Sequence, residues 1–151
     1  MYQKGDLIVY GNVGVCQVCA ITTLEIDGAA KEKLYYVLRP FNHTETIYIP
    51  TDTKVFMRPV ISAEAANSLI DMIPSIQPES YHDRNVILLS RHYENAFTSH
   101  CCKDLLELTM SIYEKRRSCS LQNKKFGQTD ERFMRKAEDL LFTELGVALS
   151  I

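Results

Sequence analysis

The fold is decided by the stretch Leu7-Ile8-Val9-Tyr10-Gly11-Asn12-Val13-Gly14-Val15, close to the start of the chain. It joins a short β-prone run to a turn, and a second β-prone run follows at once. The second run extends over about residues 15–26 and meets Asp27-Gly28, a pair typical of tight hairpins because both central turn positions need a positive φ. This pattern predicts consecutive antiparallel strands, since there is no room between them for crossover helices.

Three further strands are expected before residue 60. Residues 34–38 form the returning strand, which ends at Arg39-Pro40 because proline cannot donate a hydrogen bond to a ladder. Residues 46–50 are predicted to form a fourth strand and residues 54–57 a short fifth. Five strands in so short a segment must curl into a small barrel to bury a core.

The hydrophobic period changes to that of helices at Arg58-Pro59. Ser62 is placed to cap a helix that ends near residue 72. The last helix begins after Thr129, predicted as its N-cap, because the acidic residues that follow suit the helix dipole. Between them, helices are predicted over residues 83–98 and 103–117, with a polar loop at 118–128.

The sequence indicates a soluble cytoplasmic protein. Its N-terminus carries no apolar run of signal-peptide type, and the longest apolar stretches, such as residues 86–89, are too short to cross a bilayer. The five cysteines lie in unrelated contexts and do not look like a disulfide framework. We therefore expect no contact with a membrane.

Two cysteine pairs invite a chemical interpretation. Cys16 and Cys19 have the spacing of metal and redox sites, but in a strand residues three apart point to opposite faces. No second Cys pair or closely spaced His pair completes four ligands. Packing in the sheet is favoured over a metal site for this pair, and helix packing is favoured for Cys101 and Cys102.

Converging polar groups of the kind that enzymes need are few. The four histidines lie in unrelated contexts, and only His100 stands beside cysteines. Gly11 and Gly14 lie between predicted strands and lack the helix N-terminus that a phosphate-binding loop needs. Nucleophile-elbow and zinc-protease patterns are absent. We expect no enzyme, and no catalytic residue, cofactor, metal or small-molecule substrate.

The charge is unevenly distributed along the chain. The net charge is −2, but residues 115–136 hold eight basic and two acidic residues. A local basic surface attracts a phosphate backbone even when the whole molecule is slightly acidic. A solvated helix end and loop is the alternative explanation of this window.

Several segments, taken in order, point to one family. The opening from Lys4 to Val15 combines Gly-Asp, a β-run that ends in Tyr, and a Gly-rich turn. Further on come Asp27-Gly28, Tyr48-Ile49-Pro50, Ser90-Arg91-His92-Tyr93, and a last helix with residues 136–145. Together these segments resemble the CarD-like regulators, which share an RNA-polymerase-interacting domain with transcription-repair coupling factors. The resemblance spans nearly the whole chain.

The resemblance implies an α+β protein with an N-terminal Tudor- or SH3-like antiparallel β-barrel at residues 1–60 and a C-terminal all-α helical bundle at 61–151. The barrel would bind the β subunit of bacterial RNA polymerase by edge-strand pairing. The residues expected at that edge are Leu24, Ile47, Tyr48 and Ile49. The helical domain would contact promoter DNA, weakly and without sequence preference, and shift the balance between closed and open complexes. The residues expected at the DNA are Leu89, Arg91, His92, Tyr93, Lys115, Arg116, Lys124, Lys125 and Arg132.

The chain departs from the family pattern at several positions. A tryptophan that wedges at the minor groove in family members aligns with Leu89, and this chain has no tryptophan. Leu89 either wedges in its place or belongs to the core. Arginines on the polymerase-facing strands align with Leu24 and Tyr48, and the 118–128 loop is longer than usual. The missing tryptophan and the net acidity favour an alternative function, a Tudor-like module that binds only protein.

Overall fold

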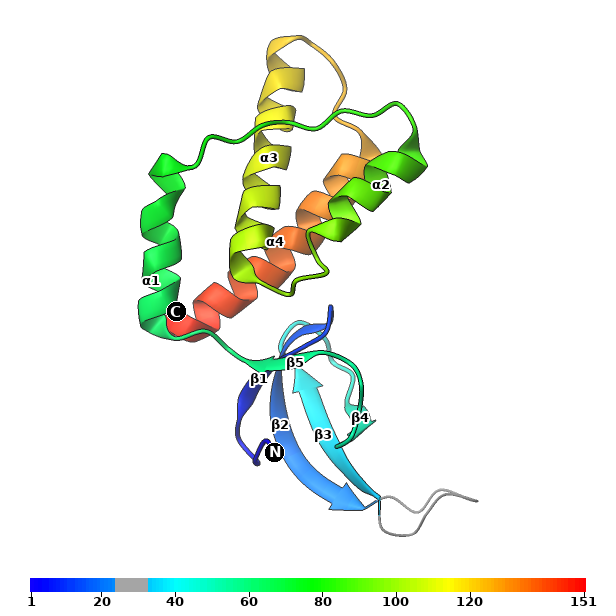
Figure 1. The fold of residues 1–151 in the computed structure, drawn as a ribbon, viewed down its shortest axis with the longest axis vertical. Helices are drawn as coiled ribbons and strands as arrows, with labels where there is room; N and C mark the ends of the chain where they lie inside the picture. Colours follow the sequence, from blue (N-terminus) through cyan, green and yellow to red (C-terminus); the bar gives the residue numbers. More distant parts are fainter. Residues whose placement is uncertain (24–32) are drawn as a thin grey trace. The chain divides into compact units, whose positions relative to one another are not determined.

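The computed structural model of the protein describes residues 1–23 and 33–151. The chain divides into two compact units, Met1–Ile61 and Ser62–Ile151. The first is a β-sheet and the second a group of helices (Figure 1). The expected class, a Tudor- or SH3-like β domain followed by a helical part, is confirmed. In the described ranges no helix is long and apolar enough to span a membrane.

The first unit is a five-stranded antiparallel sheet in the order β4-β3-β2-β1-β5. Its core is formed by side chains that alternate with exposed ones along the strands, and Ile8, Val18 and Leu38 are fully buried there. The strands are β1 (Leu7–Tyr10), β2 (Gly14–Thr23), β3 (Leu34–Pro40), β4 (Ile47–Pro50) and β5 (Met57–Pro59).

The first hairpin closes as the turn residues predict. Gly11 has a φ of +45° and Gly14 a φ of +104°, a region that side chains with a Cβ rarely adopt. A Cβ on Gly11 would also lie 3.0 Å from Cγ1 of Val55. Glycine is therefore required at this turn by both conformation and packing.

A β-bulge at Cys19 explains how β2 accommodates its two cysteines. Val18 lies opposite Leu38 whereas Ala20 lies opposite Val37, so Cys19 is an extra residue without its own partner on β3. The Cys16 side chain is fully buried in the core, and this burial raises the pKa of its thiol to about 11. Cys16 is therefore a packing residue of the sheet.

The fifth strand lies later than its prediction over residues 54–57, which was wrong. β5 begins at Met57 and pairs with β1, with Pro59 opposite Ile8. An edge strand accepts proline because the missing N–H falls on the side without a neighbour. β3 likewise continues through Pro40, beyond its pairing with β4. The predicted Asp27-Gly28 hairpin lies outside the described residues.

The second unit contains four α-helices and one short 3-10 helix. The Ser62 cap is confirmed, because its side chain accepts the N–H of Ala65 at 3.0 Å. The helices are α1 (Ala63–Met72), η1 (Ile73–Ser75), α2 (Val86–Asn95), α3 (Cys102–Leu121) and α4 (Gln128–Leu149). Their core contains Leu105, Leu108 and Ile112 of α3, Phe133, Ala137 and Leu141 of α4, and Leu89 and Tyr93 of α2.

Three predicted helix boundaries were wrong. α2 is shorter than residues 83–98, because the Asn85 side chain caps it by accepting the N–H groups of Ile87 and Leu88. α3 runs on to Leu121, so the loop is confined to residues 122–127 rather than 118–128. α4 starts at Gln128 with Gly127 at its N-cap, not Thr129.

Candidate functional site

The outer edge of β4 offers backbone groups to a partner strand. The Thr51 N–H donates to the Leu34 carbonyl of β3 at 3.0 Å. Because hydrogen bonds alternate along an antiparallel ladder, the N–H and C=O of Tyr48 then point away from β3. The Tyr48 side chain is 54% exposed, whereas Ile49 is 6% exposed and packs in the core. Tyr48 is thus a surface residue of the edge, and Ile49 supports the strand from beneath.

The opposite edge, at β5, offers fewer such groups. The Val60 N–H donates to the Leu7 carbonyl of β1, so the same alternation directs Pro59 outward. Pro59 has no N–H, and its carbonyl accepts a hydrogen bond from Nη1 of Arg58 at 3.0 Å. A strand that sought a partner would therefore find β4 the more suitable edge.

This sheet has a counterpart among known protein families. Residues 2–61, nearly the whole first unit, match the CarD-like/TRCF RID domain. The first unit is therefore similar to a CarD-like RID domain, and it is called the RID domain below. This match confirms the resemblance for the motifs within residues 2–61, and it does not cover the motifs of the helical unit. The RID family is one that interacts with RNA polymerase. A comparison with curated proteins found no match.

Three of the four residues expected at the polymerase-facing edge of the RID domain lie on β4. Ile47, Tyr48 and Ile49 are consecutive there, and only Tyr48 projects freely into solvent. Leu24, the fourth, lies outside the described residues. The alternation of side chains along a strand does not tell from the sequence whether Tyr48 faces the core or the solvent. The pairing of β4 with β3 in the structure answers this question.

In the helical unit, the structure separates the residues expected at DNA into buried and exposed groups. Leu89 is 5% exposed and Tyr93 1%, so both belong to the core. The burial of these two side chains does not fit a contact with DNA. Of the two roles expected for Leu89, a wedge at the minor groove or a core residue, the structure fits the core residue. Arg91 and His92 lie between them in sequence and are exposed on α2.

Lys115 is also buried, which contradicts its predicted contact with phosphate. Its Nζ lies 2.9 Å from Oδ1 of Asp130, and the two side chains are 9% and 6% exposed. The same Oδ1 accepts the hydroxyl of Tyr93 at 2.5 Å. Burial, and then the hydrogen bond to the Asp130 carboxylate, raise the pKa of the Tyr93 hydroxyl. This cluster joins α2, α3 and α4, and charge counting missed it because a count does not reveal which charges are paired inside.

The remaining cations of the window lie at the surface. Arg117 and Arg135 are occupied by ion pairs with Glu114 and Glu131 on their own helices. The other exposed cations, for which the described residues show no ion pair, are Arg116, Lys124, Lys125, Arg132 and Lys136. Of the predicted DNA residues, Arg116, Lys124, Lys125 and Arg132 are therefore exposed.

Aromatic contacts place part of this basic group beside α2. The rings of Tyr93 and Phe97 both pack against Phe133 of α4, with centroids 5.4 and 6.2 Å apart. Lys136 Nζ lies 4.6 Å from the centre of the Phe97 ring, and Arg132 lies over Phe133. Because residues 132 and 136 are one turn apart, they share a face of α4.

Sequence reasoning missed an exposed apolar turn at the start of α2. Val86, Ile87 and Leu88 are 58%, 67% and 46% exposed, directly after the Asn85 cap. A run of four apolar residues, 86–89, resembled a buried segment as a whole. The Asn85 cap was a signal for where the helix begins, but which of the four side chains turns inward follows from the packing of α2 on α4.

Proposed function

We propose that this protein is a transcription regulator of the bacterial cytoplasm that binds the β subunit of RNA polymerase and contacts promoter DNA to modulate open-complex formation. The RID match at residues 2–61 carries the proposal. The β4 edge supports the manner of binding, because its outward Tyr48 backbone groups suit the addition of a partner strand. The proposal includes no catalytic step.

Replacement of Tyr48 by proline tests the edge. Because the Tyr48 N–H points away from β3, Tyr48→Pro removes a donor to the partner without removing a bond of the sheet. We expect this variant to lose retention of the isolated β-subunit lobe, measured by pull-down with the full chain. Tyr48→Ala is the control, since it removes the ring but keeps the N–H, and we expect it to retain part of the binding.

The control also assigns the source of any loss. If both variants lose binding equally, the ring rather than strand pairing supplies the affinity. If wild-type protein is not retained by the lobe at all, the proposed partner is wrong. Circular dichroism of each variant verifies that the sheet persists.

Contact with DNA is proposed for the exposed part of the helical unit. The exposed first turn of α2 supplies apolar side chains, and the basic group on α4 supplies cations for phosphates. Val86 and Ile87 are better placed than buried Leu89 to abut a distorted duplex. No base-specific contact is needed for such a role.

The salt dependence of DNA retardation tests this second contact. Each phosphate contact lowers log affinity with log salt by about 0.9, so loss of one contact is expected to reduce the slope by that amount. Arg132→Ala and Lys125→Ala are expected to do so, whereas Lys115 should not be tested in this way because it is buried. Lys54→Ala, in the RID domain, is the matched control and is expected to leave the slope unchanged.

A module that binds only protein is the second candidate. The burial of Leu89 and the net charge of −2 favour it, since the family's wedge has no replacement at the aligned position. No retardation of duplex DNA at any salt concentration, together with retained binding of the β lobe, would select this candidate.

A further inference from the structure

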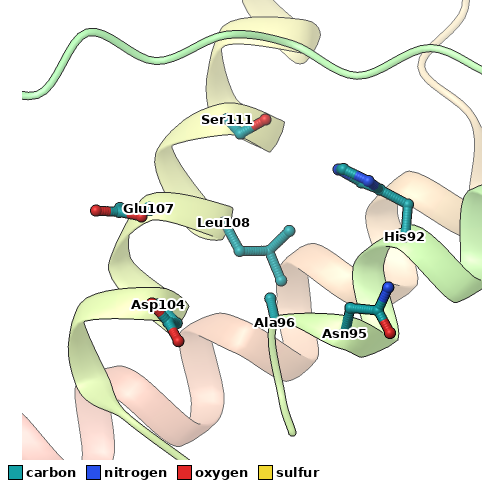
Figure 2. A pocket seen from close by; sticks show the side chains of 7 residues that line it. All are labelled: His92, Asn95, Ala96, Asp104, Glu107, Leu108 and Ser111. Atoms are coloured by element: carbon teal, nitrogen blue, oxygen red, sulfur yellow. The ribbon is translucent and has the colours of Figure 1, made fainter. Parts of the chain in front are cut away.

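A pocket of about 430 Å³ lies between α2 and α3 of the helical unit (Figure 2). It is open to solvent on one side, and its lining includes no member of the buried cluster of Tyr93, Lys115 and Asp130. The residues that line it are His92, Asn95, Ala96, Asp104, Glu107, Leu108 and Ser111.

The lining combines an apolar floor with hydrogen-bonding walls. Leu108 points into the space between the helices, with Ala96 facing it from the end of α2 (Figure 2). Asn95 and His92 project from the α2 side, and Asp104 stands at the foot of α3. A ligand with a short apolar stem and a polar head would therefore find a surface for each part.

The charged residues of the lining determine which sign of charge the polar head of a ligand should carry. No lysine or arginine is among the described residues that line the pocket, and the two carboxyl groups are Asp104 and Glu107. Burial lowers the pKa of His92, which disfavours the charged imidazolium form beside the pocket. Asp104 Oδ2 accepts the Ser99 hydroxyl at 2.5 Å, which leaves Oδ1 for a ligand. Glu107 stands at the rim, with its carboxylate turned away from α2 in Figure 2.

A segment of chain outside the pocket lining is held by two of the lining residues. This segment, residues 76–85 between η1 and α2, is called the strap. The Ser111 hydroxyl donates to the carbonyl of Glu79 in the strap at 2.5 Å. The ring of Tyr81 stacks on His92, with centroids 3.5 Å apart and planes 8° from parallel. A ligand that contacts Ser111 or His92 is therefore expected to disturb the strap as well.

We propose that this pocket binds a small organic cation, an alkylammonium or alkylguanidinium group whose stem lies on Leu108 and Ala96 and whose N–H groups donate to Asp104 and Asn95. Because Ser111 and His92 also line the pocket, an occupant lies beside them, and the strap responds to the occupancy through these two residues. The binding step does not depend on polymerase or DNA contact, so its test is independent of the proposed function.

Titration of the full chain with n-butylguanidinium and n-butylammonium, followed by two-dimensional ¹H–¹⁵N NMR, tests the proposal. We expect saturable shifts of the amides of Asn95, Ala96, Asp104 and Leu108, accompanied by shifts of Glu79 and Tyr81 in the strap. 1-Pentanol, a neutral molecule of similar length, is expected to shift these amides little, because it brings no cation to Asp104.

Variants locate the charge that holds the ligand. Asp104→Asn keeps the shape and the contact with Ser99, and we expect it to weaken binding about tenfold or more, as for loss of a charge-assisted hydrogen bond. Asn95→Lys introduces a tethered ammonium into the pocket lining and is expected to abolish binding of the free probes. Asp71→Asn, on the exposed side of α1, is the matched control and is expected to bind as the wild type does.

Three outcomes would overturn the proposal. Absence of saturable shifts up to the solubility of both cations would show that the pocket is not a site. Equal shifts with 1-pentanol would remove the cation from the assignment. Equal weakening by Asp71→Asn and Asp104→Asn would show general attraction to an acidic surface.

A last arm distinguishes the two sources of such a group. The tripeptide Gly-Arg-Gly is compared with butylguanidinium under the same conditions. Tighter binding of the peptide identifies a protein side chain as the natural ligand, and tighter binding of the free molecule identifies a metabolite. Either result supports the pocket as a cation site.

Discussion

Asp130 connects three helices inside the core of the helical unit, because it contacts Tyr93 of α2 and Lys115 of α3 from its own position on α4. It is 4% exposed, and one of its carboxylate oxygens contacts both Tyr93 and Lys115. A buried pair contributes little over an apolar pair, but removal of one partner leaves an uncompensated charge in the core. The pair therefore constrains which single substitutions the unit tolerates.

We expect Asp130→Ala to destabilise the protein by about 3–5 kcal/mol, because it leaves the Lys115 ammonium buried without its carboxylate. The free energy of unfolding in urea measures this. The double variant Asp130→Ala, Lys115→Met is expected to be more stable than the single variant, since it removes the unpaired charge as well.

Glu131→Ala provides the matched control. It breaks the exposed ion pair with Arg135, which typically contributes only about 0–1 kcal/mol. If it destabilises the protein as much as Asp130→Ala does, the burial of the Lys115–Asp130 pair is not the source of the effect.

At the scale of single residues, the sequence revealed where charged and apolar side chains are concentrated, but not which of them are buried. The basic window at 115–136 was recognised, but Lys115 and Asp130 within it neutralise each other inside the core. Leu89 was left between core and surface, and its burial follows from the three-dimensional packing of α2 on α4. Burial of one charged or apolar side chain in a mixed run depends on helical phase, which composition does not contain.

At the scale of elements, the N-terminus of α2 is fixed by one side chain. Oδ1 of Asn85 accepts the N–H groups of Ile87 and Leu88, at 2.9 and 3.3 Å. Asp83 in turn accepts the N–H of Asn85. The cap thus starts the helix at the residue that carries the exposed apolar turn.

Asn85→Ala is expected to cost about 1 kcal/mol of stability, because two N–H groups of the first turn lose their acceptor. The thermal midpoint measures the stability, and hydrogen exchange at residues 87–89 measures the fraying of the first turn. Asn85→Asp is the control, since it keeps the acceptor. Equal exchange in the alanine variant and the wild type would contradict the role of the cap.

The sequence predicted whether a segment is a helix or a strand where a capping or turn signal was present in the segment itself. The predicted ends of helices were wrong where contacts with other elements determine them. The Ser62 cap is a local signal and placed α1 correctly. Thr129 looked like a cap with acidic residues after it, but α4 begins at Gln128, and Asp130 turns into the core toward Tyr93. A Cβ at Gly127 would lie 2.9 Å from that carboxylate, so the N-cap is glycine for a reason of packing.

At the scale of the whole molecule, each of the two compact units has its own hydrophobic core. Ile8 is fully buried in the sheet, and Leu141 is fully buried among the helices. The order of a β part followed by an α part was predictable because the period of the apolar residues changes once, near residue 60. The sequence did not predict which edge residues point their backbone groups toward solvent, because this depends on the register of the strands.

Ile8→Ala and Leu141→Ala are each expected to cost about 2–5 kcal/mol through the cavity that they leave. We expect each substitution to lower the protection of its own unit selectively, because each core is closed within one unit. Hydrogen exchange of strand and helix amides under native conditions measures the two units separately. Equal loss of protection in both units after either substitution would indicate a single cooperative structure.

The two edge strands of the sheet differ in the backbone groups that they offer, and this difference limits how many strands can be added. Pro59 has no donor and its acceptor is engaged by Arg58, whereas Tyr48 keeps both groups toward solvent. A guest strand is thus accommodated better on the flank at β4 than on the flank at β5. Binding to a partner in this way is expected to saturate at one guest per molecule, and self-addition to stop at a pair of copies rather than grow into fibres.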